Sequence, residues 1–340
     1  MKKKIFPKFI AEVSANHCGS IDQAKKIILQ SKQYGADAVK IQTYEPNSMS
    51  LKLKTNKYKI KSGLWKNNYL WDLYNYAKTP FSWQKELFNF AKKNGIFLFS
   101  TPFDIKGLNI LEELGCPIYK ISSFEMNDVS LLNEIGNVKK PVIMSTGTNN
   151  LKNIENSFNF LLKKNIKEDN IALLYCVSNY PSKNSDYNLN NIRILKDKFN
   201  CKIGLSDHSK DPIIAYSSIL VGAEIIEKHV ALSNQTKGPD IQFSLKGEEI
   251  LEFKKNIDSA FKLLGKNKFV IKDKKNNFFS RSLFAKKNIS KDEIFSRKNI
   301  ISLRPNIGLS SVNFFKILNK KSPLNIKKYE PIPISILKKI

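Results

Sequence analysis

Short apolar runs recur along the first three quarters of the chain, and segments with helical periodicity separate them. The runs cover residues 8–17, 36–44, 96–104, 117–125, 141–147, 171–181, 203–206 and 223–226. Strands and helices that alternate in this way predict an α/β fold with a parallel sheet. Eight strands over this length match a closed (β/α)8 TIM barrel better than an open doubly wound sheet, and no GxGxxG motif follows the first run.

Two serines are predicted to cap helices of this barrel. Ser20 precedes a stripe of apolar positions that ends at Gly35, and Ser82 precedes a second amphipathic segment that ends at Gly95. The segment before the second helix, residues 47–80, is rich in aromatic residues and lysine. It is long enough to be a lid or a specificity element.

Polar residues close strand after strand, and in a barrel the carboxyl ends of the strands build the active site. The first run carries Glu12, Ser14, Asn16 and His17, which we expect at the rim of a site. The later runs carry Lys40, Gln42, Thr101, Lys120, Ser123, Glu125, Ser145, Ser178, Tyr180 and Ser206. A single serine or threonine is more commonly an ordinary strand-end cap, but their joint recurrence favours a binding site.

Two of these polar residues are lysines within strands. A buried lysine usually needs an anion beside it, so Lys40 and Lys120 point to a negatively charged ligand. The neighbouring hydroxyl groups belong to Thr101, Ser123, Ser145 and Ser206. We expect these residues to form a cradle for phosphate and carboxylate groups.

The stretch from Ile203 to Val230 reads as a strand, a helix over residues 211–221 and a second strand, and it holds two of the three histidines. Parallel strands joined by one crossover end at the same edge of a sheet, so His208 and His229 should converge there. Two neutral imidazoles could hold a divalent metal whose other ligands are water or substrate oxygens, although two ligands alone make a weak cage. Two hydrogen-bonded structural histidines are an equally open interpretation.

The composition is strongly basic, with 57 Lys and Arg against 30 Asp and Glu and a net charge of +27. Such a charge can indicate a nucleic acid or an anionic membrane surface as partner. Here lysine supplies most of the excess and is spread along the whole chain, and no RNA-binding aromatic signature, zinc-finger spacing or arginine-rich run accompanies it. We therefore expect a solvated surface that attracts small anionic substrates, and no nucleic-acid partner.

The cysteines and the apolar runs bear on location. Cys18, Cys116, Cys176 and Cys201 are far apart, no CxxC pair occurs and no secretory leader precedes them, so we expect reduced thiols in a cytoplasmic protein. The longest apolar runs fall far short of the ~20 residues that a membrane span needs. No membrane association is expected.

The composition changes near residue 275. We divide the chain into a barrel over residues 1–268, a lysine- and asparagine-rich linker over 269–279, and a small domain over 280–340. Its short strands and turns could present a basic face to anions, or the domain could serve for packing alone.

The motifs along the chain resemble those of the sialic acid synthase family, which comprises phosphoenolpyruvate-dependent nonulosonic acid synthases. The motifs that carry the resemblance are AEVSANHCG, AVKIQTY, FSTPFD, YKISSFE, STG, GLSDHS, IEKHV and GPDIQFSL. LWDLYNYAKTPFSW and GPDIQFSL are most similar to the pseudaminic acid synthase branch, and N-acetylneuraminate and legionaminate synthases are the alternatives. The segment from Ser280 onward resembles the family's small antifreeze-like SAF (β-clip) domain.

The resemblance implies a transferase that condenses phosphoenolpyruvate with an amino-sugar aldehyde and water, releasing phosphate by C–O cleavage. In the pseudaminate branch the sugar is 2,4-diacetamido-2,4,6-trideoxy-L-altrose. The resemblance also implies Mn²⁺ or Mg²⁺ on His208 and His229 as a Lewis acid. Glu12 matches a glutamate that orients or deprotonates the water.

The remaining site residues follow from the same residue-by-residue match. The phosphoenolpyruvate contacts would be Lys40, Thr101, Lys120, Ser123, Ser145, Ser178 and Ser206. The sugar contacts would be Gln42, Glu125, Tyr180, Asp240 and Arg304. Arg304 resembles an arginine that reaches the substrate across a domain-swapped homodimer. Its motif reads RPNIG here where the family usually has RPGxG, and we expect Asn306 to adopt the left-handed turn.

Overall fold

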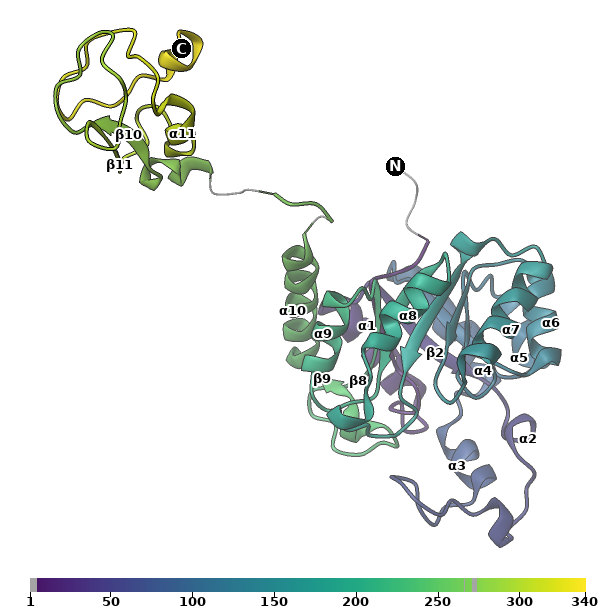
Figure 1. Cartoon of the computed structure of the whole chain (residues 1–340). Helices are drawn as coiled ribbons and strands as arrows, with labels where there is room; N and C mark the ends of the chain where they lie inside the picture. The colour runs from purple at the N-terminus through teal and green to yellow at the C-terminus, as the bar shows by residue number, and fades with distance from the viewer. Residues whose placement is uncertain (1–4, 266, 271–273) are drawn as a thin grey trace. The chain divides into compact units, whose positions relative to one another are not determined.

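The computed structural model describes residues 5–265, 267–270 and 274–340. The chain separates into two compact units, Met1–Gly265 and Lys266–Ile340 (Figure 1). Each unit has its own hydrophobic core, and each is described by itself below. Residues 271–273 of the predicted linker lie outside the described residues.

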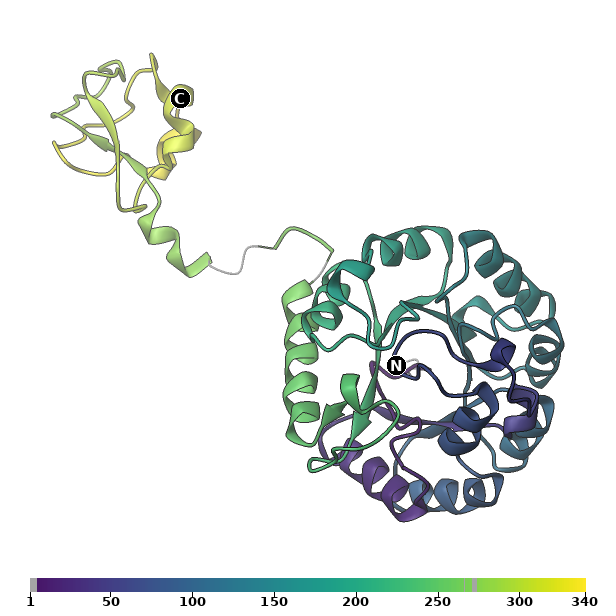
Figure 2. The ribbon, with the colours of Figure 1, turned by 90° about the horizontal axis from the view of Figure 1, so that it is seen from below.

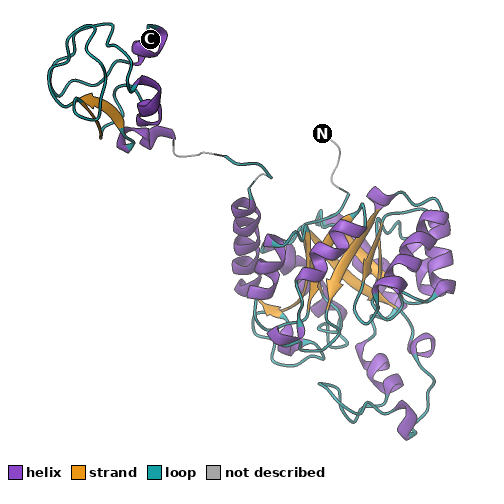
Figure 3. Cartoon of the chain, in the orientation of Figure 1, coloured by secondary structure: helices purple, strands orange, loops and turns teal. Residues whose placement is uncertain are grey.

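The first unit is a closed barrel of eight parallel strands. β1 pairs with β2 on one side and with β8 on the other, which closes the sheet and confirms the predicted TIM barrel. Figure 3 shows the strands with helices on either side of them. The strands are β1 (Phe9–Glu12), β2 (Ala38–Thr43), β3 (Leu98–Pro102), β4 (Tyr119–Ile121), β5 (Val142–Ser145), β6 (Ile171–Cys176), β7 (Lys202–Asp207) and β8 (Ile225–Ala231), and the short β9 (Leu245–Lys246) pairs with β8.

The helices of this unit are α1 (Ile21–Gln33), α2 (Pro46–Met49), α3 (Leu70–Ala77), α4 (Phe81–Lys93), α5 (Ile105–Glu113), α6 (Val129–Val138), α7 (Leu151–Lys163), α8 (Asn190–Lys198), α9 (Ile213–Leu220) and α10 (Glu248–Leu264). Most of the helices pack on the outside of the strands through apolar residues, whereas the short α2 and α3 belong to the segment between β2 and α4. Ser20 caps α1 as predicted, because its hydroxyl accepts a hydrogen bond from the Gln23 amide at 3.2 Å. The Ser82 cap was wrong: α4 begins at Phe81 behind Pro80, so Ser82 already lies inside the helix.

The eighth strand is longer than its apolar run. The sequence predicted an end at residue 226, but β8 continues through Glu227, Lys228 and His229, all of them buried. The Lys228 ammonium forms an ion pair at 2.8 Å with Asp207 of β7, so a charged residue is accommodated inside the sheet. The charged residues Glu227 and Lys228, which follow the apolar run, are therefore part of a barrel strand. Each has an opposite charge beside it, so its burial is tolerated.

The aromatic and lysine-rich segment between β2 and α4, predicted as a lid or a specificity element, extends from the barrel strands. It carries the short helices α2 and α3. In Figure 2, seen from below, this dark blue segment lies over the middle of the ring of helices. Backbone hydrogen bonds from Ile60 N to Asn68 O and from Asn67 N to Ile60 O, both 2.9 Å long, close a loop within it.

The second unit is small and contains short elements. β10 (Ser282–Ala285) and β11 (Ile300–Leu303) pair antiparallel, α11 covers Phe314–Ile317, and the core includes the fully buried Phe295. Asn306 does not have a positive φ angle, so the prediction of a left-handed turn there was wrong. Its amide donates to the Phe278 carbonyl at 3.0 Å. Within the described ranges of both units, no helix combines the length and apolarity that a membrane crossing requires.

Candidate active site

A cavity of about 480 Å³ lies at the carboxyl ends of the barrel strands, a size typical of small-molecule sites. Every barrel residue predicted to act in catalysis or to bind metal, phosphoenolpyruvate or sugar lines it. These residues are Glu12, Lys40, Gln42, Thr101, Lys120, Ser123, Glu125, Ser145, Ser178, Tyr180, Ser206, His208, His229 and Asp240. Arg304 belongs to the second unit, where its side chain is exposed. Its role stays a prediction.

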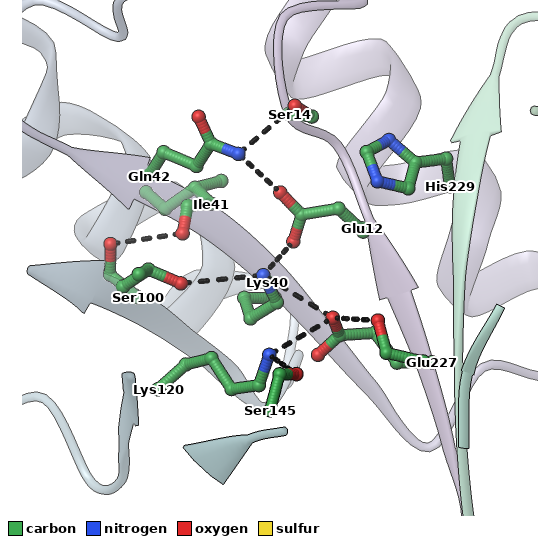
Figure 4. Close-up of polar contacts among 12 residues, drawn as sticks. Glu12, Ser14, Lys40, Ile41, Gln42, Ser100, Lys120, Ser145, Glu227 and His229 are labelled. Atoms are coloured by element: carbon green, nitrogen blue, oxygen red, sulfur yellow. Dashed lines mark hydrogen bonds and ion pairs between the residues drawn. The ribbon is translucent and has the colours of Figure 1, made fainter. Parts of the chain in front are cut away.

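The floor of the cavity is a cluster of four buried charges, shown in Figure 4. The Lys40 ammonium lies 2.6 Å from a Glu12 carboxylate oxygen and 3.6 Å from Glu227 Oε1. The Lys120 ammonium lies 3.3 Å from the same Glu227 oxygen. Two cations and two anions thus share one buried site, which satisfies the requirement that a buried charge be paired.

Glu227 is the residue that sequence reasoning missed, because the predicted strand ended one residue before it. Its Oε1 also accepts a hydrogen bond from Ser206 Oγ at 3.0 Å, whereas its Oε2 has no hydrogen-bond partner in the described part of the chain. Burial alone would raise the pKa of Glu227, but Lys120, Lys40 and the Ser206 hydroxyl lower it to about 2. The negative charge of Glu227 therefore holds both ammonium groups in place.

The two lysines differ electrostatically. Burial lowers the pKa of each, but Glu12 and Glu227 together outweigh it for Lys40, whose pKa is raised. For Lys120, burial and the charge of Lys40 outweigh Glu227, so its pKa is lowered. Lys120 consequently gains most from an added anion, because a nearby negative charge favours its charged form.

Hydroxyl groups complete the predicted cradle. Lys40 Nζ donates to Thr101 Oγ1 at 3.3 Å, Lys120 Nζ donates to Ser145 Oγ at 2.6 Å, and the Ser123 and Ser178 hydroxyls lie 3.0 Å apart. Their placement on neighbouring strand ends makes a concave surface rich in donors.

Gly147 allows the Ser123 and Ser178 side chains to approach the backbone closely. It has φ of +37°, and a Cβ atom there would collide with the Ser123 side chain and lie 2.6 Å from Ser178 Oγ. Only glycine satisfies both the backbone conformation and the space.

The two histidines converge as predicted, with ring centroids 5.5 Å apart. His208 Nδ1 lies 2.9 Å from the Val177 carbonyl, which can only accept, so its Nε2 carries no proton and is available to a metal. Burial and then the neighbouring His229 lower the pKa of His208 to about 3, which keeps the ring neutral. His229 Nδ1 is buried without a hydrogen-bond partner among the described residues and lies 3.6 Å from Asp240 Oδ2.

These atoms fit an open metal site better than a closed one. No group of three or more His, Cys, Asp or Glu side chains in the described ranges is placed to enclose an ion. Two imidazoles, of which His229 has an Nδ1 without a hydrogen-bond partner among the described residues, leave the other coordination positions to oxygen ligands from water or substrate. Catalytic sites keep such open positions.

Of the polar side chains near Glu12, some line the cavity and others make hydrogen bonds outside it. Gln42 Nε2 donates to Glu12 Oε1 at 3.2 Å and to Ser14 Oγ at 3.0 Å, which fixes both acceptors at the cavity wall. Asn16 and His17, predicted at the rim, do not line the cavity. His17 Nε2 lies 3.3 Å from Thr79 Oγ1 and Asn16 donates to the Val230 carbonyl, so both stabilise loops instead.

Three residues predicted to face the sugar, Tyr180, Asp240 and Glu125, also line the cavity. The Tyr180 ring lies 4.4 Å from the His208 ring, centroid to centroid. Asp240 accepts a hydrogen bond from the Ala15 amide at 3.3 Å and faces His229. Glu125 lies on another wall, where burial raises the pKa of its carboxyl to about 7. A carboxyl that titrates near neutrality can both donate and accept hydrogen bonds.

A barrel with a charged cavity at its strand ends defines this protein as a TIM-barrel enzyme that acts on an anionic substrate. Residues 27–269 match the model of the NeuB family, and the chain belongs to that family.

Its similarity to individual relatives extends over nearly the whole chain. It is 40% identical to the pseudaminic acid synthase of Campylobacter jejuni, over 96% of this chain and 94% of that one. It is 36% identical to the N,N'-diacetyllegionaminic acid synthase of the same organism, over 98% and 99%. The N-acetylneuraminic acid synthetase structure from Leptospira borgpetersenii superimposes with a TM-score of 0.70 at 31% identity, covering 79% of this chain and 88% of that one.

Proposed function

We propose that this enzyme is a pseudaminic acid synthase, which condenses phosphoenolpyruvate with 2,4-diacetamido-2,4,6-trideoxy-L-altrose and water to give pseudaminate and phosphate. The charged floor carries the proposal, because two buried lysines surrounded by hydroxyls suit a substrate with a phosphate and a carboxylate. The greater identity to the Campylobacter pseudaminic acid synthase than to its legionaminic counterpart supports the choice of sugar.

Phosphoenolpyruvate lies on the floor in this proposal. Lys40 and Lys120 neutralise its charge, and the hydroxyls orient it through short hydrogen bonds. These hydroxyls belong to Thr101, Ser123, Ser145, Ser178 and Ser206. Glu227 acts through the lysines: it holds both ammonium groups between the strands before substrate arrives, so less ordering is needed on binding.

His208 and His229 would hold a divalent metal such as Mn²⁺ or Mg²⁺. When bound, the ion supplies a Lewis acid that polarises the carbonyl oxygen of the open-chain sugar. Val177 fixes the tautomer of His208 through its carbonyl, which directs Nε2 toward the ligand.

Glu12 is the candidate base. C3 of phosphoenolpyruvate attacks the sugar aldehyde, and water adds at C2 before the C–O bond to phosphate breaks. Glu12 lies at the cavity wall, held by Gln42 and Lys40, where it can accept the proton of that water. Gln42, Glu125, Tyr180 and Asp240 face the space left for the sugar.

We also propose that the second unit is an SAF domain and that Arg304 acts in trans within a domain-swapped homodimer. The barrel cavity has no arginine among its lining residues, and the Arg304 side chain is exposed. Its guanidinium can donate to an acylamino carbonyl. Mixing inactive Arg304→Ala and His208→Ala chains should restore part of the activity, because a mixed dimer holds one intact site. A mixture that stays inactive although mass measurement shows mixed dimers contradicts the arrangement in trans.

The four cysteines are free, which supports the proposed cytoplasmic location.

Legionaminate synthesis is the second candidate, favoured by the full-length similarity to the Campylobacter legionaminic enzyme.

The test is phosphate release from phosphoenolpyruvate with three hexose precursors, those of pseudaminate, legionaminate and N-acetylneuraminate, with the product masses measured. Highest kcat/KM with the pseudaminate precursor is expected, and highest kcat/KM with another sugar would reassign the enzyme within the family. Polyanion binding that falls steeply with salt, without any phosphate release, would favour a non-catalytic role instead.

A further inference from the structure

The roof of the cavity comes from the segment between β2 and α4, and its inner face carries no charge. The side chains that this segment contributes include Met49, Ile60, Leu64, Trp65, Leu70 and Leu73. The same segment holds seven lysines, at positions 52, 54, 57, 59, 61, 66 and 78, and none of them lines the cavity. A segment so rich in lysine thus faces the cavity with uncharged residues, most of them apolar; Ser62, Tyr44 and Tyr74 add hydroxyl groups.

Contacts with distant loops hold this roof over the cavity. The Trp65 indole N–H donates to the Pro239 carbonyl at 3.1 Å, and the Trp65 ring lies 5.3 Å from the Tyr180 ring, centroid to centroid. Tyr180 follows β6 and Pro239 follows β8, so the roof reaches loops from other strands. The segment lies across the barrel mouth in Figure 2.

The roof side chains are only half-buried. Ile60, Leu64 and Leu73 are neither fully exposed nor enclosed by protein, and they face the cavity. Apolar surface in a cavity is stabilised when an apolar group covers it, by roughly 0.8 kcal/mol for each buried CH₂. Phosphoenolpyruvate has only one CH₂ group and its charges belong on the floor, so the apolar groups must be those of the sugar.

We propose that Ile60, Leu64 and Leu73 make the enzyme specific for methyl-bearing sugars: acetamido groups, and a 6-methyl group in place of a hydroxymethyl group. This assignment rests on the proposed function and adds the residues that select the sugar. A sugar 6-hydroxyl packed against these three side chains would lose its hydrogen bonds to water, and none of the three offers it a polar partner. The preference is therefore built into the loop, whereas the barrel strands supply the chemistry.

The experiment compares two sugars that differ at one position, the 2,4-diacetamido-2,4,6-trideoxy hexose and its 6-hydroxy counterpart. The wild-type enzyme should prefer the 6-deoxy sugar by roughly 10-fold or more in kcat/KM, as expected for one group in an apolar pocket. Leu64→Ser and Leu73→Ser should each bring this ratio close to one by raising the KM for the 6-deoxy sugar, and the KM for phosphoenolpyruvate should not change.

Two control variants separate specificity from folding. Leu64→Met should keep the wild-type ratio, because it preserves an apolar surface. Leu53→Ser should also keep it, because Leu53 lies in the same segment but is exposed and does not line the cavity. A ratio that the Leu64→Ser and Leu73→Ser variants leave at the wild-type value would overturn the assignment, as would an equal change in Leu53→Ser.

Saturation-transfer NMR tests the roof without turnover. The acetamido and C6 methyl protons of the sugar should receive the strongest saturation from the wild-type protein, and Leu73→Ser should weaken it. Equal methyl saturation in both proteins would refute the roof assignment. Failure of both sugars to release phosphate would refute the proposed function instead, and the NMR result would still decide the role of the roof.

Discussion

The floor and the roof of the cavity are built in opposite ways. The floor consists of barrel strands, and its charged residues are almost completely buried: Glu12 is 1% exposed, Lys40 4%, Lys120 3% and Glu227 4%. The roof is a loop segment whose cavity-facing side chains carry no charge, and its apolar residues Ile60, Leu64 and Leu73 are half-buried. In the proposed arrangement, the strands hold phosphoenolpyruvate with fixed charges, and the loop contacts the substrate part that varies between related sugars.

The difference also separates stability from specificity. Removing one member of a buried ion pair leaves the other charge unpaired and costs about 3–5 kcal/mol. Replacing a half-buried leucine on a loop removes little protein packing, so its effect falls mainly on the ligand. Changes to the floor should therefore alter folding and chemistry together, whereas changes to the roof should alter the choice of sugar.

The largest effect is expected at the two histidines beside the floor. His208→Ala or His229→Ala should lower phosphate release by about 1000-fold or more, because each removes one of two protein ligands for a Lewis acid worth several kcal/mol. Bound manganese per chain should fall in parallel. His17→Asn is the control, since His17 does not line the cavity. Undiminished metal-dependent activity in either alanine variant would refute the metal assignment.

The next effect concerns the floor lysines. Lys120→Gln should raise the KM for phosphoenolpyruvate by roughly 10- to 150-fold, because a charge-assisted contact to an anion contributes about 1.5–3 kcal/mol. The KM for the sugar should change little. Lys61→Gln, on an exposed lysine of the roof segment, should leave both constants unchanged. A rise confined to the sugar KM would mean that phosphoenolpyruvate does not lie on the floor.

A smaller effect should follow from crowding the hydroxyl cradle. Gly147→Ala combines a strained φ, worth roughly 1–3 kcal/mol, with a collision against Ser123, so the melting temperature should fall and the KM for phosphoenolpyruvate should rise. Gly115→Ala is the matched control, because Gly115 also has a positive φ but a Cβ there meets nothing within 4 Å. Equal KM values in the two variants would show that Gly147 matters only through its backbone.

The smallest effect is a dependence of stability on pH. Burial raises the pKa of Glu125 from 4.5 to about 7, so folded protein keeps a proton that unfolded protein loses between these values. Stability from this group is present at low pH and is lost as pH rises toward 7. Glu125→Gln should therefore be more stable than wild type at pH 8 and equal to it at pH 4, measured by denaturant unfolding. The exposed Glu113→Gln should show no such difference.

The barrel and most of its site could be predicted because both depend on local pattern. Apolar runs mark strands, and the residues that follow them share one edge, so Lys40, Lys120 and His208 could be placed together before any coordinates were known. Asn16 and His17 were misplaced for the same reason. A strand end identifies which residues approach the mouth but not which turn back into the loops.

Other features could not be predicted because they depend on long-range pairing. Glu227 and Lys228 interrupt an apolar run, and only their partners on other strands show that they lie within β8. The roof has no simple periodicity, so its inner and outer faces become distinct only through the contacts of Trp65. The sequence predicted Ser82 as the cap of α4, but Pro80 occupies the cap position. The course of the preceding loop determines where a helix begins.

The most direct test of the central claim follows the oxygen that leaves phosphoenolpyruvate. Phosphoenolpyruvate labelled with oxygen-18 in its C2–O–P bridge is incubated with the enzyme, metal and the 2,4-diacetamido sugar, and the products are examined by phosphorus NMR and mass spectrometry. If water adds at C2 and the C–O bond breaks, the label appears in inorganic phosphate and the nine-carbon acid is unlabelled. Label retained in the sugar acid, with unlabelled phosphate, would show P–O cleavage and contradict the proposed chemistry.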